Sequence, residues 1–104
     1  MARFDVYAHP VVAMRKFTPF LLDVQNDFID GLDSRVVIPL RSAALYRIRL
    51  RDLNPAFEIT DKPVVLDTAA LAAFPARELV KPVANLERQQ EEIVAAMDCL
   101  FGSY

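Results

Sequence analysis

The chain has 104 residues, of which 54% are hydrophobic and 25% are charged. This balance excludes an intrinsically disordered protein, which needs low hydrophobicity and high net charge. A chain of this length forms one domain, here residues 1–104. The formal net charge of −2 leaves no overall positive field that would attract the phosphates of a duplex. We therefore expect a single globular domain that does not coat nucleic acid.

Three further observations concern the cellular compartment. No stretch reaches the ~18 apolar residues of a membrane-spanning helix. The N-terminus lacks the apolar segment typical of a secretory signal. Cys99 is the one cysteine of the sequence, which excludes an internal disulfide and fits a reducing environment. We therefore expect a cytoplasmic protein with no membrane partner.

Seven prolines divide most of the chain into pieces of strand length, because each removes a backbone donor and fixes φ. Between them, β-branched and aromatic runs predict strands at residues 4–7, 20–25, 35–40, 57–60, 64–66 and 79–83. The alternation in Phe57-Glu58-Ile59 is typical of an antiparallel sheet with one face in water. Thr60-Asp61-Lys62-Pro63 predicts a tight turn, so we expect a hairpin over residues 57–66.

The periodicity changes after Asn85. Apolar side chains then recur along one arc of a predicted amphipathic helix, which consists of Leu86, Ile93, Met97 and Leu100, with Val94 and Phe101 at its edge. Asn85 is placed to cap the start of this helix, and Gly102 to end it in a left-handed turn. We expect a mainly β fold with a C-terminal α-helix, its strands forming a strongly twisted sheet or a partly closed barrel.

Residues that usually carry catalysis or bind metals are sparse. His9 is the one histidine, and no serine or cysteine near it has the setting of a nucleophile, so we interpret it as an exposed loop residue. Cys99 falls on the polar side of the predicted helix, and we interpret it as an ordinary thiol or an interface residue. One histidine and one cysteine cannot supply the three or four ligands of a zinc site. We expect no metal, no other cofactor and no enzymatic activity.

Carboxylates gather at Asp23, Asp27, Asp30 and Asp33. A calcium loop needs oxygen ligands at alternating positions with a glycine at the sharp turn, and the spacing here fits that pattern poorly. We interpret these residues as a strand end followed by a polar turn.

An otherwise acidic chain has four arginines in one region, Arg41, Arg47, Arg49 and Arg51. The last three alternate with Ile48 and Leu50, so an extended segment would direct their guanidinium groups to one side. Two interpretations stay open. The residues form a solvated face whose ion pairs contribute about 0–1 kcal/mol each, or a strip that binds an acidic peptide through hydrogen bonds of about 1.5–3 kcal/mol each.

A central block consists of two segments, Leu22-Asp23-Val24-Gln25-Asn26-Asp27-Phe28-Ile29-Asp30 and Arg35-Val36-Val37-Ile38-Pro39-Leu40. In this block the sequence closely resembles the CcdB family of toxins from bacterial toxin–antitoxin modules. The resemblance continues through Phe4, Ser42-Ala43, Leu53-Asn54-Pro55, Val83-Ala84 and Phe101. It covers nearly the whole chain, apart from a few extra residues between Ala8 and Phe17.

The resemblance implies an SH3-like barrel of antiparallel strands with a small side sheet and a C-terminal helix, assembled as a symmetric homodimer. It implies a toxin without enzymatic activity that binds the A subunit of DNA gyrase and traps the enzyme on cleaved DNA. A cognate antitoxin with an acidic, disordered tail would release the toxin from gyrase. Only the toxin–antitoxin complex would bind DNA, where it represses its own operon.

The resemblance also implies the site residues. Family members that poison gyrase end in Phe-Trp-Gly-Ile, whereas Phe101 is followed here by Gly102, Ser103 and Tyr104. We expect the tyrosine ring to replace the tryptophan, so that the tail facing the target consists of Phe101, Gly102 and Tyr104. The expected dimer interface consists of Met97, Leu100 and Phe101. The expected antitoxin contacts are Arg41, Arg47, Arg49 and Arg51.

Two alternative functions stay open. Because a fold does not fix a function, the first is an endoribonuclease toxin on the same barrel. The second is a non-toxic homologue that acts only in dimerisation and operon regulation, which the divergent tail favours.

Overall fold

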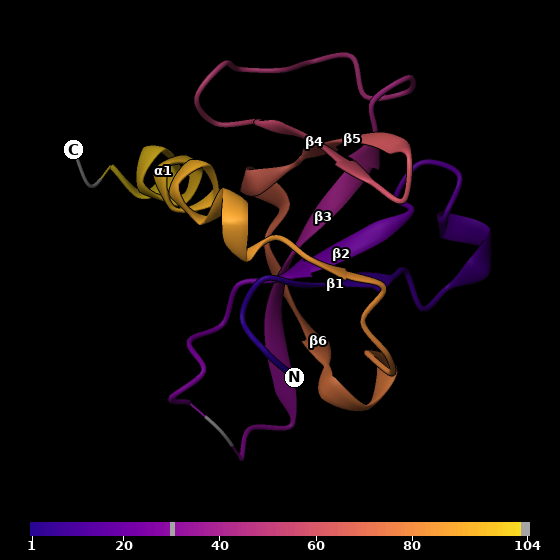
Figure 1. Ribbon diagram of the computed structural model, residues 1–104, viewed down its shortest axis with the longest axis vertical. Coiled ribbons are helices and arrows are strands. Elements are labelled where there is room, and N and C mark those ends of the chain that lie inside the picture. Colours follow the sequence, from indigo (N-terminus) through magenta and orange to yellow (C-terminus); the bar gives the residue numbers. More distant parts are fainter. Residues whose placement is uncertain (30, 103–104) are drawn as a thin grey trace.

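The computed structural model describes residues 1–29 and 31–102. Its strands are β1 (Asp5–Ala8), β2 (Phe20–Asp23), β3 (Ser34–Ser42), β4 (Ala56–Ile59), β5 (Lys62–Leu66), β6 (Ala72–Pro75) and β7 (Ala84–Asn85). They pair antiparallel in the order β4-β5-β3-β2-β1-β7, and β6 pairs with β3 outside this path. The sheet curls into a nearly closed barrel with β6 as a side strand and one C-terminal helix (Figure 1). The predicted mainly β fold is confirmed.

Strand β3 holds the architecture together because it pairs with three other strands. Its first half pairs with β6, its central residues with β2, and its last residues, from Leu40 to Ser42, with β5. The sheet therefore branches at β3. A strand of nine residues is long enough for this, whereas most of its neighbours have only four or five.

Apolar side chains pack on both faces of the sheet. Because successive residues of a strand point to opposite faces, Val6 and Tyr7 enter different clusters, as do Leu21 and Leu22. The larger cluster is covered by the C-terminal helix, whose Ile93 is fully buried. The smaller cluster consists of Tyr7, Leu21, Val37 and Leu79, with Phe74 packed against it.

The predicted hairpin is confirmed as β4 and β5. Ile59 pairs with Lys62, so Thr60 and Asp61 form a two-residue loop with φ values of 47° and 68°. Positive φ at both central positions is typical of a type I′ turn, which matches the twist of the flanking strands and usually contains Asn-Gly. Here two residues with a Cβ carry the strain of that geometry.

The strand predicted at residues 79–83 is wrong, and β6 was not predicted. Leu79 is buried, but Val80 and Val83 are exposed, and Pro82 has no backbone donor for a ladder. The β-branched residues therefore have no sheet to pack against. Strand β6 has the sequence Ala-Ala-Phe-Pro, which has little β propensity of its own and is stabilised by pairing with β3.

The C-terminal helix α1 (Gln90–Phe101) begins later than predicted. Asn85 lies in β7 and does not cap α1: its Oδ1 accepts a hydrogen bond at 2.8 Å from the N–H of Glu87, the first residue of a 3-10 turn at Glu87–Gln89 that precedes α1. Gly102 ends α1 in the left-handed conformation as predicted, and its N–H donates to the Asp98 carbonyl. Within residues 1–29 and 31–102, no helix is long and apolar enough to cross a membrane.

Candidate functional site

The predicted tail begins at an exposed helix end. Phe101 is the last residue of α1, and 63% of it is exposed. Met97 and Leu100, which we expect at the dimer interface, are half-buried on the same helix. Tyr104 lies outside the described residues. The described part of the tail therefore presents one large apolar ring to solvent.

A second exposed apolar segment lies between β2 and β3, where the sequence pattern predicts only a polar turn. Phe28 is 96% exposed, and Ile29 and Leu32 are also exposed. The Phe28 N–H donates to Asn26 Oδ1 at 2.9 Å, so the backbone beside the ring is held in place. The signal that could have revealed this segment is a pair of large apolar residues, Phe28 and Ile29, inside a run of carboxylates.

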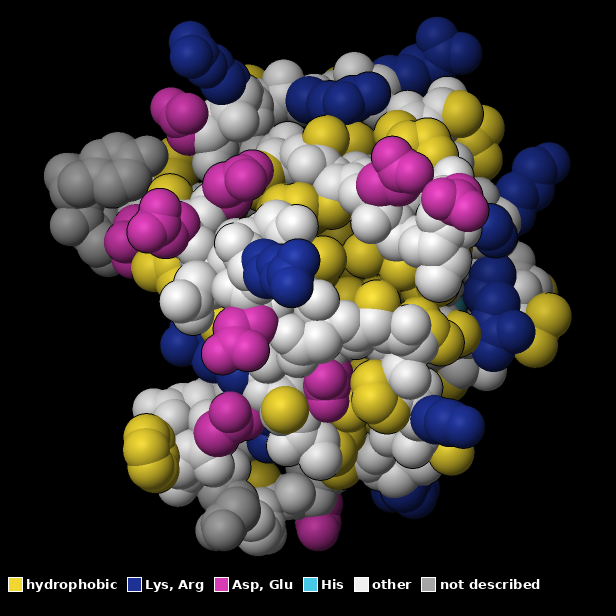
Figure 2. All heavy atoms as spheres, viewed as in Figure 1, with side chains coloured by type: hydrophobic (Ala, Val, Ile, Leu, Met, Phe, Trp, Pro, Cys, Tyr) yellow, Lys and Arg dark blue, Asp and Glu magenta, His cyan; other side chains and the backbone are white. Residues whose placement is uncertain are grey.

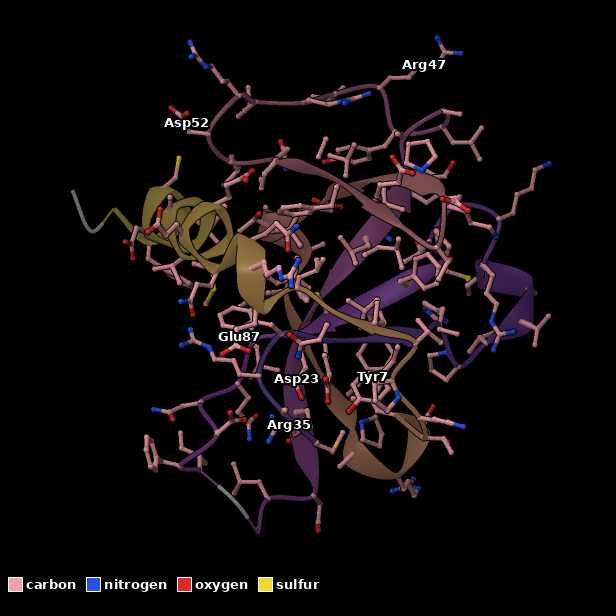
Figure 3. All side chains as sticks on the ribbon, viewed as in Figure 1. Tyr7, Asp23, Arg35, Arg47, Asp52 and Glu87 are labelled. Carbon is pink, nitrogen blue, oxygen red and sulfur yellow. The ribbon has the colours of Figure 1, made fainter. Side chains whose placement is uncertain are left out.

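A buried ion pair lies at the base of this segment. Arg35 donates to both carboxylate oxygens of Asp23, from Nε at 2.8 Å and from the second terminal nitrogen at 3.0 Å. The Asp23 side chain is fully buried and also accepts the Gln25 N–H at 3.0 Å. Gln25 Oε1 in turn accepts the Val36 N–H at 3.0 Å, which ties the end of β2 to β3. Figure 3 shows Asp23 and Arg35 facing each other.

The carboxylates near this pair change the ionisation of their neighbours. Burial, together with the smaller effects of the negative charges of Asp5 and Asp23, raises the pKa of Tyr7 to about 12. Hydrogen bonds from Arg35 to Asp23 raise the pKa of the guanidinium group against the opposing effect of its burial. Arg35 and Tyr7 therefore keep their protons throughout the physiological pH range.

The two apolar segments lie on the same side of the molecule. Figure 1 shows α1 and the loop between β2 and β3 both at the left of the view, with the sheet to their right. Phe28 and Phe101 belong to these two elements and are both highly exposed. Exposed aromatic residues gathered on one side are typical of a surface that binds another protein.

The arginine segment lies in a long loop between β3 and β4. Residues 46–50 belong to no helix, strand or turn, and Arg47, Arg49 and Arg51 are exposed. Ile48 is 78% exposed and Leu50 is exposed too, so the alternation does not separate a dry face from a wet one. The arginines and the apolar residues of this segment are therefore both in contact with solvent. Figure 3 shows the Arg47 side chain projecting away from the body of the molecule.

Arg41 differs from the other three arginines because its guanidinium group is bound by side chains of this chain, Asp67 and Thr18. Its Nε and one terminal nitrogen lie 3.0 and 2.9 Å from Asp67 Oδ2, and its other terminal nitrogen donates to Thr18 Oγ1 at 2.6 Å. Its guanidinium carbon lies 5.2 Å from the centre of the Phe17 ring. Tyr46 donates to Asp67 Oδ1 at 3.1 Å, so this cluster anchors the start of the arginine loop.

The far end of the arginine loop packs near α1 and leaves two grooves of about 450 Å³ each. Arg51 and Asp52 line both grooves. One groove also contains Glu92 and Ala95, and the other contains Leu50, Leu53, Cys99 and Leu100. The structure thus brings one predicted antitoxin contact, Arg51, to the same groove as one predicted dimer contact, Leu100.

His9 is not an exposed loop residue. Only 6% of it is exposed, and its ring lies edge-on to Phe74 with the ring centres 5.9 Å apart. Its Nδ1 accepts the Val11 N–H at 3.0 Å, and burial lowers the pKa of the imidazole. The sequence prediction was wrong because Phe74 comes from a strand that was not predicted. A neutral, buried ring of this kind serves packing.

Comparison with known families supplies the deciding observation. A family model described as CcdB protein matches residues 3–102. The chain belongs to the CcdB family. CcdB proteins are toxins of toxin–antitoxin modules, and the match includes both the Phe28 segment and α1 through Gly102.

Proposed function

We propose that this CcdB-family toxin is a cytoplasmic, dimeric protein without enzymatic activity that inhibits DNA gyrase. It binds the gyrase A subunit and traps the enzyme on cleaved DNA. The observation that supports the proposal most directly is the pair of exposed rings, Phe28 and Phe101, on one side of a chain that belongs to a family of gyrase poisons.

The energetics favour binding at this surface. A buried aromatic side chain removes about 150–250 Å² from water. At about 25 cal/mol per Å², covering a fully exposed ring of this size contributes about 4–6 kcal/mol, and the contribution of Phe101 is smaller than that of Phe28 because 63% of it is exposed against 96%. The Asp23–Arg35 pair lies at the base of the loop that carries the first ring, and the second ring lies on the last residue of α1.

The proposed dimer interface contains Met97, Leu100 and Phe101. The proposed antitoxin contacts are Arg47, Arg49 and Arg51, with Arg41 anchoring the loop that carries them. An antitoxin segment that follows the loop toward α1 reaches the groove shared by Arg51 and Leu100. Such a segment would compete with any target that also covers the end of α1, which accounts for release of the target without a chemical step.

The test is a supercoiling assay with purified gyrase, relaxed plasmid and the purified toxin. We expect loss of supercoiling and accumulation of protein-linked DNA breaks. The control is a double variant, Phe28→Ala with Phe101→Ala, whose folding is checked by circular dichroism and which we expect to leave gyrase active. Growth arrest on induction with intact DNA and normal supercoiling would remove gyrase as the target. Specific cleavage of messenger RNA would instead favour the endoribonuclease alternative.

A further inference from the structure

A basic pocket lies at the opposite end of the arginine loop from α1. Its volume is about 290 Å³, and its lining residues are Arg15, Lys16, Pro19, Ser42, Ala44, Lys62 and Pro63. Three of these residues are cations and none is acidic. In an acidic chain of net charge −2, this is a local excess of positive charge.

Three segments that are distant in the sequence build the pocket. They are the residues after the 3-10 turn Val12–Met14, the end of β3 and the start of β5. Backbone hydrogen bonds join them, from the Ser42 N–H to the Phe17 carbonyl at 2.8 Å and from the Ala43 N–H to the Pro63 carbonyl at 3.1 Å. The pocket is therefore preformed by the barrel and does not depend on the conformation of a long loop.

The positive charges around the pocket are not neutralised within the described chain. None of the ion pairs among residues 1–29 and 31–102 involves Arg15, Lys16 or Lys62. Arg15 donates from Nε to the His9 carbonyl at 2.7 Å, which leaves its terminal nitrogens available. Asp61 precedes Lys62 in the turn but does not line the pocket. Like charges in one small volume repel one another, and an anion between them relieves this repulsion.

We propose that this pocket binds a carboxylate side chain of an acidic peptide. Its size fits one side chain, and Pro19 and Pro63 provide apolar walls for the methylene groups of a glutamate. The Ser42 hydroxyl can donate to the carboxylate beside the cations. A duplex fits poorly, because its phosphates lie on a stiff, convex surface and require several cations spread along it.

The position of the pocket extends the proposed antitoxin site, and for the identity of its natural partner this inference rests on the proposed function. Ala44 lines the pocket, and Arg47 follows only three residues later. Figure 2 shows Lys and Arg side chains along the upper and right rims of the molecule, whereas most Asp and Glu side chains in this view lie elsewhere. An acidic segment bound along Arg47, Arg49 and Arg51 can thus continue into the pocket.

The experiment titrates the purified toxin with a synthetic peptide of alternating glutamate and leucine, followed by calorimetry. The test variant is Lys16→Gln with Lys62→Gln. The matched control is Lys81→Gln with Arg88→Gln, which removes the same charge from exposed positions outside the pocket. We expect the pocket variant to weaken binding about tenfold or more and the control to weaken it less than about threefold.

Two results would overturn the proposal that this pocket binds a carboxylate. Equal weakening in both variants would show that binding follows net charge alone, and tighter binding of a duplex oligonucleotide that depends on Lys16 and Lys62 would assign the site to nucleic acid. The supercoiling assay separates this inference from the proposed function. We expect the pocket variant to inhibit gyrase as the unmodified toxin does. A toxin that binds the peptide through the pocket but leaves gyrase active would refute only the gyrase proposal.

Discussion

Arg35 holds the fully buried carboxylate of Asp23 with two nitrogens, at 2.8 and 3.0 Å, at the base of the loop that exposes Phe28. Asp23 ends β2, and Arg35 is the second residue of β3. The pair therefore closes the base of the loop that carries one half of the proposed target-binding surface. Its loss should affect both the stability of the fold and the position of the exposed ring.

Replacing Asp23 by asparagine leaves the Arg35 charge buried without its partner. We expect Asp23→Asn to lower the free energy of unfolding by about 3–5 kcal/mol, measured by urea denaturation. The control is Asp27→Asn, because Asp27 lies 3.8 Å from Arg35 with its side chain 54% exposed. We expect that variant to lose no more than about 1 kcal/mol. Similar losses in the two variants would contradict the importance of the buried pair.

The hairpin turn predicts a stabilising substitution. Asp61 has a φ of 68°, a conformation that costs an L residue with a Cβ about 1 kcal/mol and costs glycine little. We expect Asp61→Gly to raise the midpoint of urea denaturation. Asp33 is not among the positive-φ residues, so Asp33→Gly should lower that midpoint through the greater entropy of the unfolded chain. A loss of stability in Asp61→Gly would argue against the turn geometry.

Because His9 is buried, we expect the free energy of unfolding to fall in acid. Burial lowers the pKa of its imidazole in the folded protein, and the positive charges of Arg15 and Arg41 lower it in the same direction, whereas the hydrogen bond with Val11 and the charge of Glu78 oppose the shift. Its stabilising contribution is therefore present above the unfolded pKa of about 6.5 and is lost as the pH falls through the folded pKa. We expect the unmodified protein to lose more stability than His9→Asn between about pH 7 and about pH 5. Equal losses in urea denaturation would show that His9 does not titrate on unfolding.

The arginine loop predicts a salt-sensitive contact with the antitoxin. We expect the triple variant Arg47→Ala, Arg49→Ala and Arg51→Ala to bind the antitoxin at least about tenfold more weakly and with a smaller dependence on salt. Arg77→Ala with Arg88→Ala is the control, since both residues are exposed outside this loop. An unaltered dissociation constant at low salt would exclude the loop from the antitoxin site.

Truncation of the exposed rings of Phe28 and Phe101 should reduce toxicity. Truncation of a central aromatic contact costs about 2–4 kcal/mol of binding, so we expect Phe28→Ala and Phe101→Ala each to raise the toxin concentration that inhibits gyrase by tenfold or more. Tyr104→Ala should also weaken killing if the tyrosine replaces the family's tryptophan. Val80→Ala provides the control, because Val80 is exposed but belongs to neither segment. Unchanged killing by all three variants would refute the assignment of this surface.

Local patterns in the sequence are sufficient to predict those elements whose cause is local. Runs of β-branched and aromatic residues predict the central strands, the Thr60-Asp61 pair predicts the hairpin, and Gly102 predicts the end of α1. Strand β6 and the burial of His9 both depend on contacts that are distant in the sequence, with β3 and with Phe74. These contacts override local propensity, and no single-residue signal reveals them.

The candidate site was predictable in part for the same reason. Residue type identifies Phe101 and the arginines as candidates, but it does not reveal that Arg41 is held by Asp67 or that Phe28 faces water. The Asp23–Arg35 pair joins residues on neighbouring strands, so it becomes visible only once the register of β2 and β3 is known. Exposure and pairing are properties of the assembled sheet.

The larger core cluster joins Phe4 and Val6 near the start of the chain to Ile93 and Ala96 near its end. A polypeptide still being synthesised cannot complete this cluster until α1 has left the ribosome, because the barrel lacks its cover until then. The N-terminal strand and the C-terminal helix therefore acquire their shared core in one late step of folding, although they lie at opposite ends of the described chain.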